Sequence, residues 1–71
     1  MPTIELPFCF LDNQLRPYSV RKWGGTVWLF YWGPEDNWVS LRALTDIEVE
    51  GFAMRRLPNE QMKLYDDRAF R

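Results

Sequence analysis

Tryptophan and arginine are the residue types in this sequence whose spacing could do chemistry, and that chemistry is molecular recognition. They are the residue types most enriched at binding hot spots. Arg21 and Arg42 are predicted to lie on neighbouring strands on either side of Trp28, where their guanidinium groups can contact its indole. Each such contact contributes roughly 0.5–1 kcal/mol when it is exposed to solvent. The candidate partner-binding residues are Arg21, Trp23, Trp28, Trp32, Trp38 and Arg42.

Side chains suited to catalysis or metal binding are scarce in this chain. It contains no histidine, the commonest general base and metal ligand. Cys9, the single cysteine, has no histidine to activate it and lies between Phe8 and Phe10, so we interpret it as a small buried hydrophobe. The Gly24-Gly25 pair is not followed by the Lys-Ser or Lys-Thr of a phosphate loop. We therefore expect a non-enzymatic protein that uses no cofactor and no metal.

Length and composition indicate one small domain, residues 1–71. Hydrophobic residues make up 46% of the chain and aromatic residues 17%, which is enough for a dense core in a chain near the lower size limit for unaided folding. No apolar run approaches the roughly 20 residues that span a bilayer, and no secretory signal is evident. A single cysteine fits a reducing compartment. These features predict a soluble cytoplasmic protein.

The strands that must position the tryptophans are predicted over residues 18–44. Gly24 and Gly25 separate two strand-like runs and form a two-residue hairpin signal, because both positions tolerate positive φ. With that turn, Arg21 lies directly across from Trp28. The run from 18 to 32 is therefore expected to be an antiparallel hairpin.

A second turn, residues 33–37, is expected to reverse the chain again and to add a third strand. It places Trp32 opposite Trp38. Counting outward from that pair gives three further pairs: Tyr31 with Val39, Leu29 with Leu41, and Trp28 with Arg42. The two turns were assigned independently and agree on which residues share a face, whereas a one-residue slip at either turn would mix the faces.

The predicted sheet has two unlike faces. The aliphatic face carries Tyr18, Val20, Lys22, Val27, Leu29, Tyr31, Val39, Leu41 and Ala43. The other, which we call the Trp/Arg face, carries Ser19, Arg21, Trp23, Thr26, Trp28, Phe30, Trp32, Trp38, Ser40 and Arg42.

The segments on both sides of the meander complete the predicted fold. Residues 1–11 have the alternation of an extended segment, and Pro7 restricts any strand there to the sheet edge. Thr45-Asp46-Ile47-Glu48 is a capping box that begins a helix ending near Arg56. Gly51 weakens this helix by roughly 1 kcal/mol relative to Ala, so we expect a close packing contact there. Pro58 begins a second helix that continues to about residue 68, which gives a helical pair over 45–70.

The expected fold class is α+β, a three-stranded antiparallel meander that leaves room for a fourth, N-terminal edge strand. Two short C-terminal helices pack on the aliphatic face. The expected function is an interaction module that binds a protein partner, or a second copy in a homodimer, through the Trp/Arg face. An inhibitor or adaptor, such as those carried by phages and mobile elements, has this kind of design.

Two alternatives use the same residues. The Trp/Arg face could be a second core covered by the N-terminal segment. It could instead bind single-stranded nucleic acid by stacking bases on the tryptophans, although the formal net charge of -1 argues against a phosphate-tracking surface. The exposure of the tryptophans distinguishes a second core from a binding face.

Overall fold

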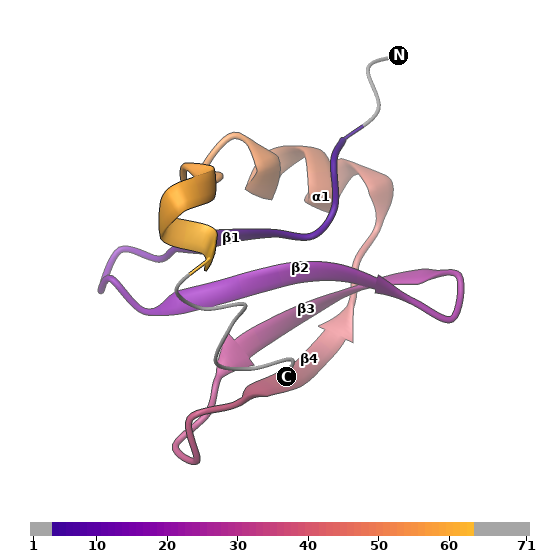
Figure 1. Ribbon diagram of the computed structural model, residues 1–71. Coiled ribbons are helices and arrows are strands. Elements are labelled where there is room, and N and C mark those ends of the chain that lie inside the picture. Colours follow the sequence, from indigo (N-terminus) through magenta and orange to yellow (C-terminus); the bar gives the residue numbers. More distant parts are fainter. Residues whose placement is uncertain (1–3, 64–71) are drawn as a thin grey trace.

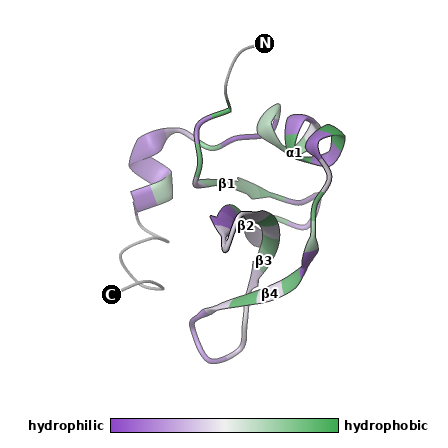
Figure 2. Cartoon of the chain, turned by 90° about the vertical axis from the view of Figure 1, so that its right-hand side faces the viewer, coloured by the Kyte–Doolittle hydropathy of each residue, from purple (hydrophilic) through white to green (hydrophobic). Residues whose placement is uncertain are grey.

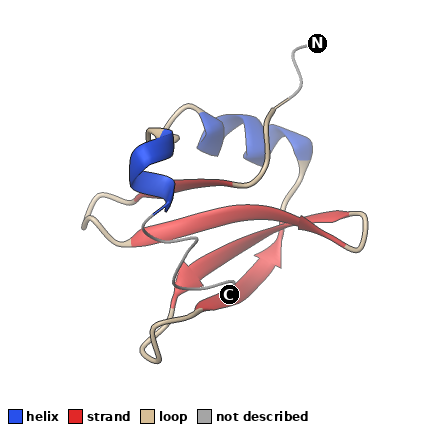
Figure 3. Ribbon diagram, in the orientation of Figure 1, coloured by secondary structure: helices blue, strands red, loops and turns tan. Residues whose placement is uncertain are grey.

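The computed structural model describes residues 4–63 and shows one antiparallel sheet with helices beside its first strand (Figures 1 and 3). The strands and helix are β1 (Phe8–Leu11), β2 (Pro17–Trp23), β3 (Thr26–Trp32), β4 (Trp38–Ala43) and α1 (Asp46–Ala53). The sheet order is β1-β2-β3-β4, and a further short helix covers residues 59–63. The α+β class, the fourth strand at the edge and the two short helices are thereby confirmed.

The β2–β3 hairpin has the predicted register. Gly24 and Gly25 both have positive φ, 60° and 81°. These angles are typical of the hairpin turn whose twist matches that of the flanking strands. Arg21 lies opposite Trp28, as predicted.

The β3–β4 register is correct near its turn and wrong farther along. Trp32 pairs with Trp38 as predicted, but a bulge interrupts the register between Leu29 and Phe30. Leu41 is the extra residue, because Phe30 pairs with Ser40 while Leu29 pairs with Arg42. An extra residue shifts all later pairs by one position. The predicted pairs Leu29–Leu41 and Trp28–Arg42 are therefore wrong, and Trp28 lies opposite Ala43.

β1 joins the sheet as an edge strand instead of lying over the Trp/Arg face. Its outer edge is covered by the chain that follows α1: Phe10 forms an isolated bridge with Arg56, and the Leu57 N–H donates to the Cys9 carbonyl at 2.8 Å. The Cys9 N–H donates to the sulfur of Met62 at 3.1 Å. Covering the edge in this way satisfies backbone groups that could otherwise pair with another chain. Cys9 is fully buried, as predicted.

The main core lies between the aliphatic face and α1. The Phe10 ring stacks on Tyr18 of β2 and on Phe52 of α1, with ring centroids 5.4 Å and 4.7 Å apart. Figure 2 shows that β1 is almost wholly hydrophobic where it runs beside the helices. The buried hydrophobic residues are Phe8, Cys9, Phe10, Val20, Leu29, Trp38, Val49 and Met62.

Helix α1 begins as predicted and ends earlier. The Glu48 N–H donates to the Thr45 hydroxyl, and the Glu48 carboxylate accepts from the Thr45 N–H, so the capping box is confirmed. The helix ends at Ala53 instead of near Arg56. The reason is tertiary, since Arg56 leaves the helix to pair with the edge of β1. The second helix follows Pro58 as predicted, and its expected continuation lies outside the described residues.

The two glycines outside the hairpin have opposite surroundings. A Cβ atom on Gly33 would lie 2.8 Å from Cγ2 of Val39 and 3.3 Å from the backbone carbonyl oxygen of Asn37. A Cβ on Gly51 would meet no atom within 4 Å, so the expected packing contact at Gly51 is wrong. Gly33 is thus required by close packing, whereas Gly51 is not.

Substituting Gly33 by Ala is expected to lower the free energy of unfolding by about 1–3 kcal/mol, because the stiff, β-branched side chain of Val39 cannot move away without disturbing β4. Gly51→Ala is the matched control and should raise it by about 0.4–1 kcal/mol. Urea unfolding of both variants measures the difference. Equal midpoints for the two variants would contradict the packing described for Gly33.

Candidate functional site

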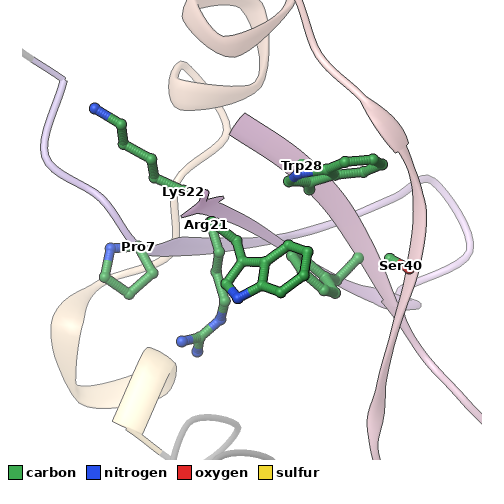
Figure 4. A pocket seen from close by; sticks show the side chains of 7 residues that line it. Pro7, Arg21, Lys22, Trp28 and Ser40 are labelled. Carbon is green, nitrogen blue, oxygen red and sulfur yellow. The ribbon is translucent and has the colours of Figure 1, made fainter. Parts of the chain in front are cut away.

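An open groove of about 510 Å³ crosses the Trp/Arg face (Figure 4). Its lining residues are Pro7, Arg21, Lys22, Trp23, Trp28, Phe30 and Ser40. Its volume falls within the range of about 300–1,000 Å³ that is typical of ligand pockets. The groove can therefore hold a few side chains of a partner.

Strand pairing brings the walls of the groove together. Arg21 and Trp28 face each other across β2 and β3, and Phe30 faces Ser40 across β3 and β4. Pro7 immediately precedes β1, on the far side of β2. Figure 4 shows Pro7 and Trp28 on opposite sides of the groove. The groove thus depends on all four strands.

Trp23 is the most exposed aromatic side chain of the groove. It ends β2 beside the Gly24-Gly25 turn, and 74% of its surface is accessible to solvent. Burying a large apolar side chain is worth roughly 1.5–3 kcal/mol. Trp23 therefore shows that this end of the Trp/Arg face is not a closed second core, and it offers apolar area to a ligand.

The side chain of Arg21 is held by a buried residue of its own strand, Ser19. Its Nε donates to the hydroxyl of Ser19 at 3.0 Å, and Ser19 is fully buried. This hydrogen bond restrains the guanidinium group of Arg21. Lys22 adds a second positive charge, and no carboxylate of residues 4–63 lines the groove. The groove therefore has aromatic walls and a positive charge.

The indole N–H of Trp28 is buried and has no hydrogen-bond acceptor within residues 4–63. A buried donor without an acceptor costs roughly 1–3 kcal/mol. Such groups are few in native proteins and call for a specific explanation. Here the unsatisfied donor belongs to a wall of the groove.

Trp32 and Trp38 belong to the predicted site but lie outside the groove. Their rings meet edge to face, with centroids 5.0 Å apart at 85°, beside the β3–β4 turn. The Trp32 indole N–H donates to the Asp36 carboxylate at 3.1 Å, and Trp38 is 8% exposed. This pair stabilises the turn and closes part of the Trp/Arg face. The second-core alternative thus describes Trp38, whereas Trp23 contradicts it.

Arg42, the remaining predicted site residue, also lies away from the groove. The bulge places it opposite Leu29 instead of Trp28. Its guanidinium group forms an ion pair with Glu48 of α1. The carboxylate of Glu48 also accepts from the Thr45 N–H, and that hydrogen bond, together with Arg42, lowers the pKa of Glu48 below its ordinary value of 4.5. Arg42 therefore connects β4 to the beginning of α1.

Four residues that line the groove are not among the predicted site residues: Pro7, Lys22, Phe30 and Ser40. Phe30 and Ser40 were assigned to the correct face, so their alternation with Trp28 could have identified them. Lys22 was assigned to the opposite face, and nothing in its spacing indicated the groove. Pro7 is brought there by the pairing of β1 with β2, which no local signal specifies.

Neither a metal site, nor a membrane-spanning helix, nor a known relative is found for the described chain. Within residues 4–63, no three His, Cys, Asp or Glu side chains are grouped so that they could hold a metal ion, and no helix is long and apolar enough to cross a membrane. Comparison with protein families, curated proteins and solved structures finds no match for this chain.

Replacing Glu48 by Gln is expected to reduce the acid sensitivity of the fold. Because the folded-state pKa of Glu48 is lowered, its contribution to stability is present above pH 4.5 and is lost as the pH falls through the lower folded-state pKa. Native protein should therefore lose more stability than E48Q between about pH 5 and pH 3. Urea unfolding at several pH values gives the free energy of unfolding of each protein as a function of pH. If that free energy falls equally with pH in native protein and in E48Q, the lowered pKa of Glu48 is contradicted.

Proposed function

We propose that this chain is a small non-enzymatic interaction module that binds a protein partner through the groove. The observation that carries this proposal is the 74% exposure of Trp23 beside an open groove walled by Trp28 and Arg21. Tryptophan and arginine are among the residue types most enriched at binding hot spots. A partner that covers Trp23 would gain the burial of its indole.

The charges of the groove favour a different protein over a second copy. In a two-fold dimer the same patch meets itself. Two copies placed groove to groove would bring Arg21 and Lys22 of one against those of the other, and like charges in apposition are unfavourable. The proposed partner is therefore another protein.

The distribution of charge also favours protein over single-stranded nucleic acid. Proteins follow a phosphate backbone with a row of cations, whereas the described part of the chain supplies two lining cations, Arg21 and Lys22. The chain as a whole has a formal net charge of -1. The groove is suited to a short segment with few charges.

A protein of this size with one proposed binding surface fits the role of an inhibitor or adaptor, which binds a site on its partner and catalyses no reaction. The buried thiol of Cys9 supports a reducing, cytoplasmic location for this role. The inhibitor or adaptor role rests on the groove, and the location rests on Cys9.

The test uses three full-length baits: native protein, Trp23→Ala and Arg42→Ala. We expect native and R42A baits to capture the same protein from cell extract and W23A to lose it. Calorimetry with that purified protein should then show that W23A weakens binding by about 10- to 150-fold, which corresponds to 1.5–3 kcal/mol. W23A should unfold within about 0.5 kcal/mol of native protein, because the side chain is exposed.

Two outcomes would contradict the proposal. The first is a W23A bait that captures the same proteins as the native bait. The second is Trp23-dependent binding to a thymidine oligonucleotide of about 12 nucleotides, with an affinity that falls steeply as salt rises. That second result would indicate the nucleic-acid function.

A further inference from the structure

We infer that the outer face of α1 is a self-association surface, on which a second copy of this chain docks with its own α1 antiparallel to the first. This goes beyond the proposed function, because the outer face of α1 and the groove are different surfaces. Three features of the helix carry the inference: its exposed apolar side chains, its glycine and the charges at its ends.

Two apolar side chains at the ends of α1 lie almost wholly in solvent. Among the large hydrophobic residues of the described chain, Met54, the C-cap, and Ile47 have the highest exposed fractions, 89% and 81%. They are separated by about two helical turns, so they lie on the same side of the helix. The inner side is the one that packs in the core, where Val49 is buried and Phe52 stacks on Phe10. The helix is thus apolar on its outer side as well as on its inner side.

Gly51 lies between these two side chains on the outer side of α1. It is one turn after Ile47 and one turn before Met54. Glycine destabilises a helix interior relative to alanine, and a Cβ atom on Gly51 would meet no atom within 4 Å. Packing within the chain therefore does not require a glycine at this position. Because glycine lets another backbone approach closely, a contact with another molecule accounts for it.

The charges of α1 favour a second copy in the antiparallel direction. Asp46 and Glu48 lie in the first turn, whereas Arg55 follows the last turn and is exposed. An antiparallel pair brings the acidic end of each helix beside Arg55 of the other copy and places the two helix dipoles in opposite directions. Arg55 donates from Nη2 to the side-chain oxygen of Asn13, which leaves the other donors of its guanidinium group for a carboxylate.

A two-fold axis near Gly51 makes the pairing reciprocal. Ile47 of each copy then lies opposite Met54 of the other, and the two glycines meet at the axis. Glu50, the neighbour of Gly51, lies near Glu50 of the second copy, which opposes association. A helix of eight residues is about 12 Å long, so the buried area should fall below the standard size of roughly 1,200–2,000 Å². The expected dimer is therefore weak.

This dimer leaves both grooves open. The groove lies on the Trp/Arg face, whereas α1 lies on the other side of the sheet, next to β1 (Figure 1). Two copies joined through α1 therefore present two grooves. A partner that carries two binding segments would be held more tightly by the pair than by one groove.

Sedimentation equilibrium of the full-length chain between about 10 μM and 1 mM, the range in which weak complexes form, tests the dimer. We expect the average mass of native protein to rise from that of one chain toward that of two. Ile47→Asn removes an apolar contact, and Gly51→Lys places bulk and like charges at the two-fold axis, so each should weaken dimerisation about tenfold or more. Lysine forms helices better than glycine, so G51K should unfold at the same or a higher urea concentration than native protein. Loss of the G51K dimer would then not result from unfolding.

Trp23→Ala is the matched control, because it removes another exposed apolar side chain, from the groove. W23A should dimerise as native protein does. Native protein that remains a monomer at 1 mM would overturn the inference, and so would a dimer that persists unchanged in I47N and G51K.

Two further variants test the antiparallel arrangement. Glu50→Gln removes the like charges near the axis and should dimerise more tightly than native protein. Mild oxidation should link two copies of the Ile47→Cys/Met54→Cys protein, whereas I47C alone should form little covalent dimer, because the two copies of position 47 lie at opposite ends of the contact. An E50Q dimer no tighter than the native one, or efficient linkage of I47C alone, would contradict this arrangement.

The results separate this inference from the proposed function. A monomeric native chain that still captures a partner through Trp23 would overturn the dimer and leave the groove as a protein-binding surface. A dimer whose W23A bait still captures the same proteins would overturn the proposed function and leave the dimer in place.

Discussion

The positive φ angles of Gly24 and Gly25 determine the register of β2 against β3, and the two faces of the sheet follow from that register. With this turn, Val20 lies opposite Leu29 on the side that α1 covers, and Arg21 lies opposite Trp28 on the other side. A slip of one residue would place the tryptophan in the main core and the aliphatic pair in the groove. Core and groove are thus two consequences of one turn.

The small size of the chain limits how much of either face of the sheet can be covered. A domain of about 60 residues buries roughly 60% of the surface that its unfolded chain exposes. Here α1 packs on the β1 side of the aliphatic face, while Leu41 on β4 stays 51% exposed, and the segment after α1 satisfies the edge of β1. On the opposite face, Trp38 is buried with Trp32 against it, while Trp23 stays in solvent. The groove is the part of the Trp/Arg face that the described chain leaves open.

The bulge in β4 separates two roles that the alternation of the sequence had combined. It moves Arg42 away from Trp28 and toward Glu48, where the ion pair and the capping box act on the same carboxylate. Among residues 4–63, the cationic side chains that line the groove are then Arg21 and Lys22. One arginine of the predicted pair, Arg42, therefore links β4 to α1, and the other, Arg21, lines the groove.

What the sequence by itself determined are the features whose causes lie within a few residues. The Gly24-Gly25 turn, the alternation of the strands and the capping box at Thr45 are of this kind, so the fold class and the β2–β3 register could be predicted. The tertiary structure alone decided the bulge at Leu41, the place of Pro7 in the groove and the end of α1 at Ala53. Each of these depends on a contact between segments that are distant in the sequence. Pro7 depends on the pairing of β1 with β2, the end of α1 on the bridge between Phe10 and Arg56, and the bulge accompanies the ion pair of Arg42 with Glu48. Local propensity carries no information about such contacts. For the same reason residue types could nominate the tryptophans, while only the packed structure could show that Trp38 is buried and Trp23 is exposed.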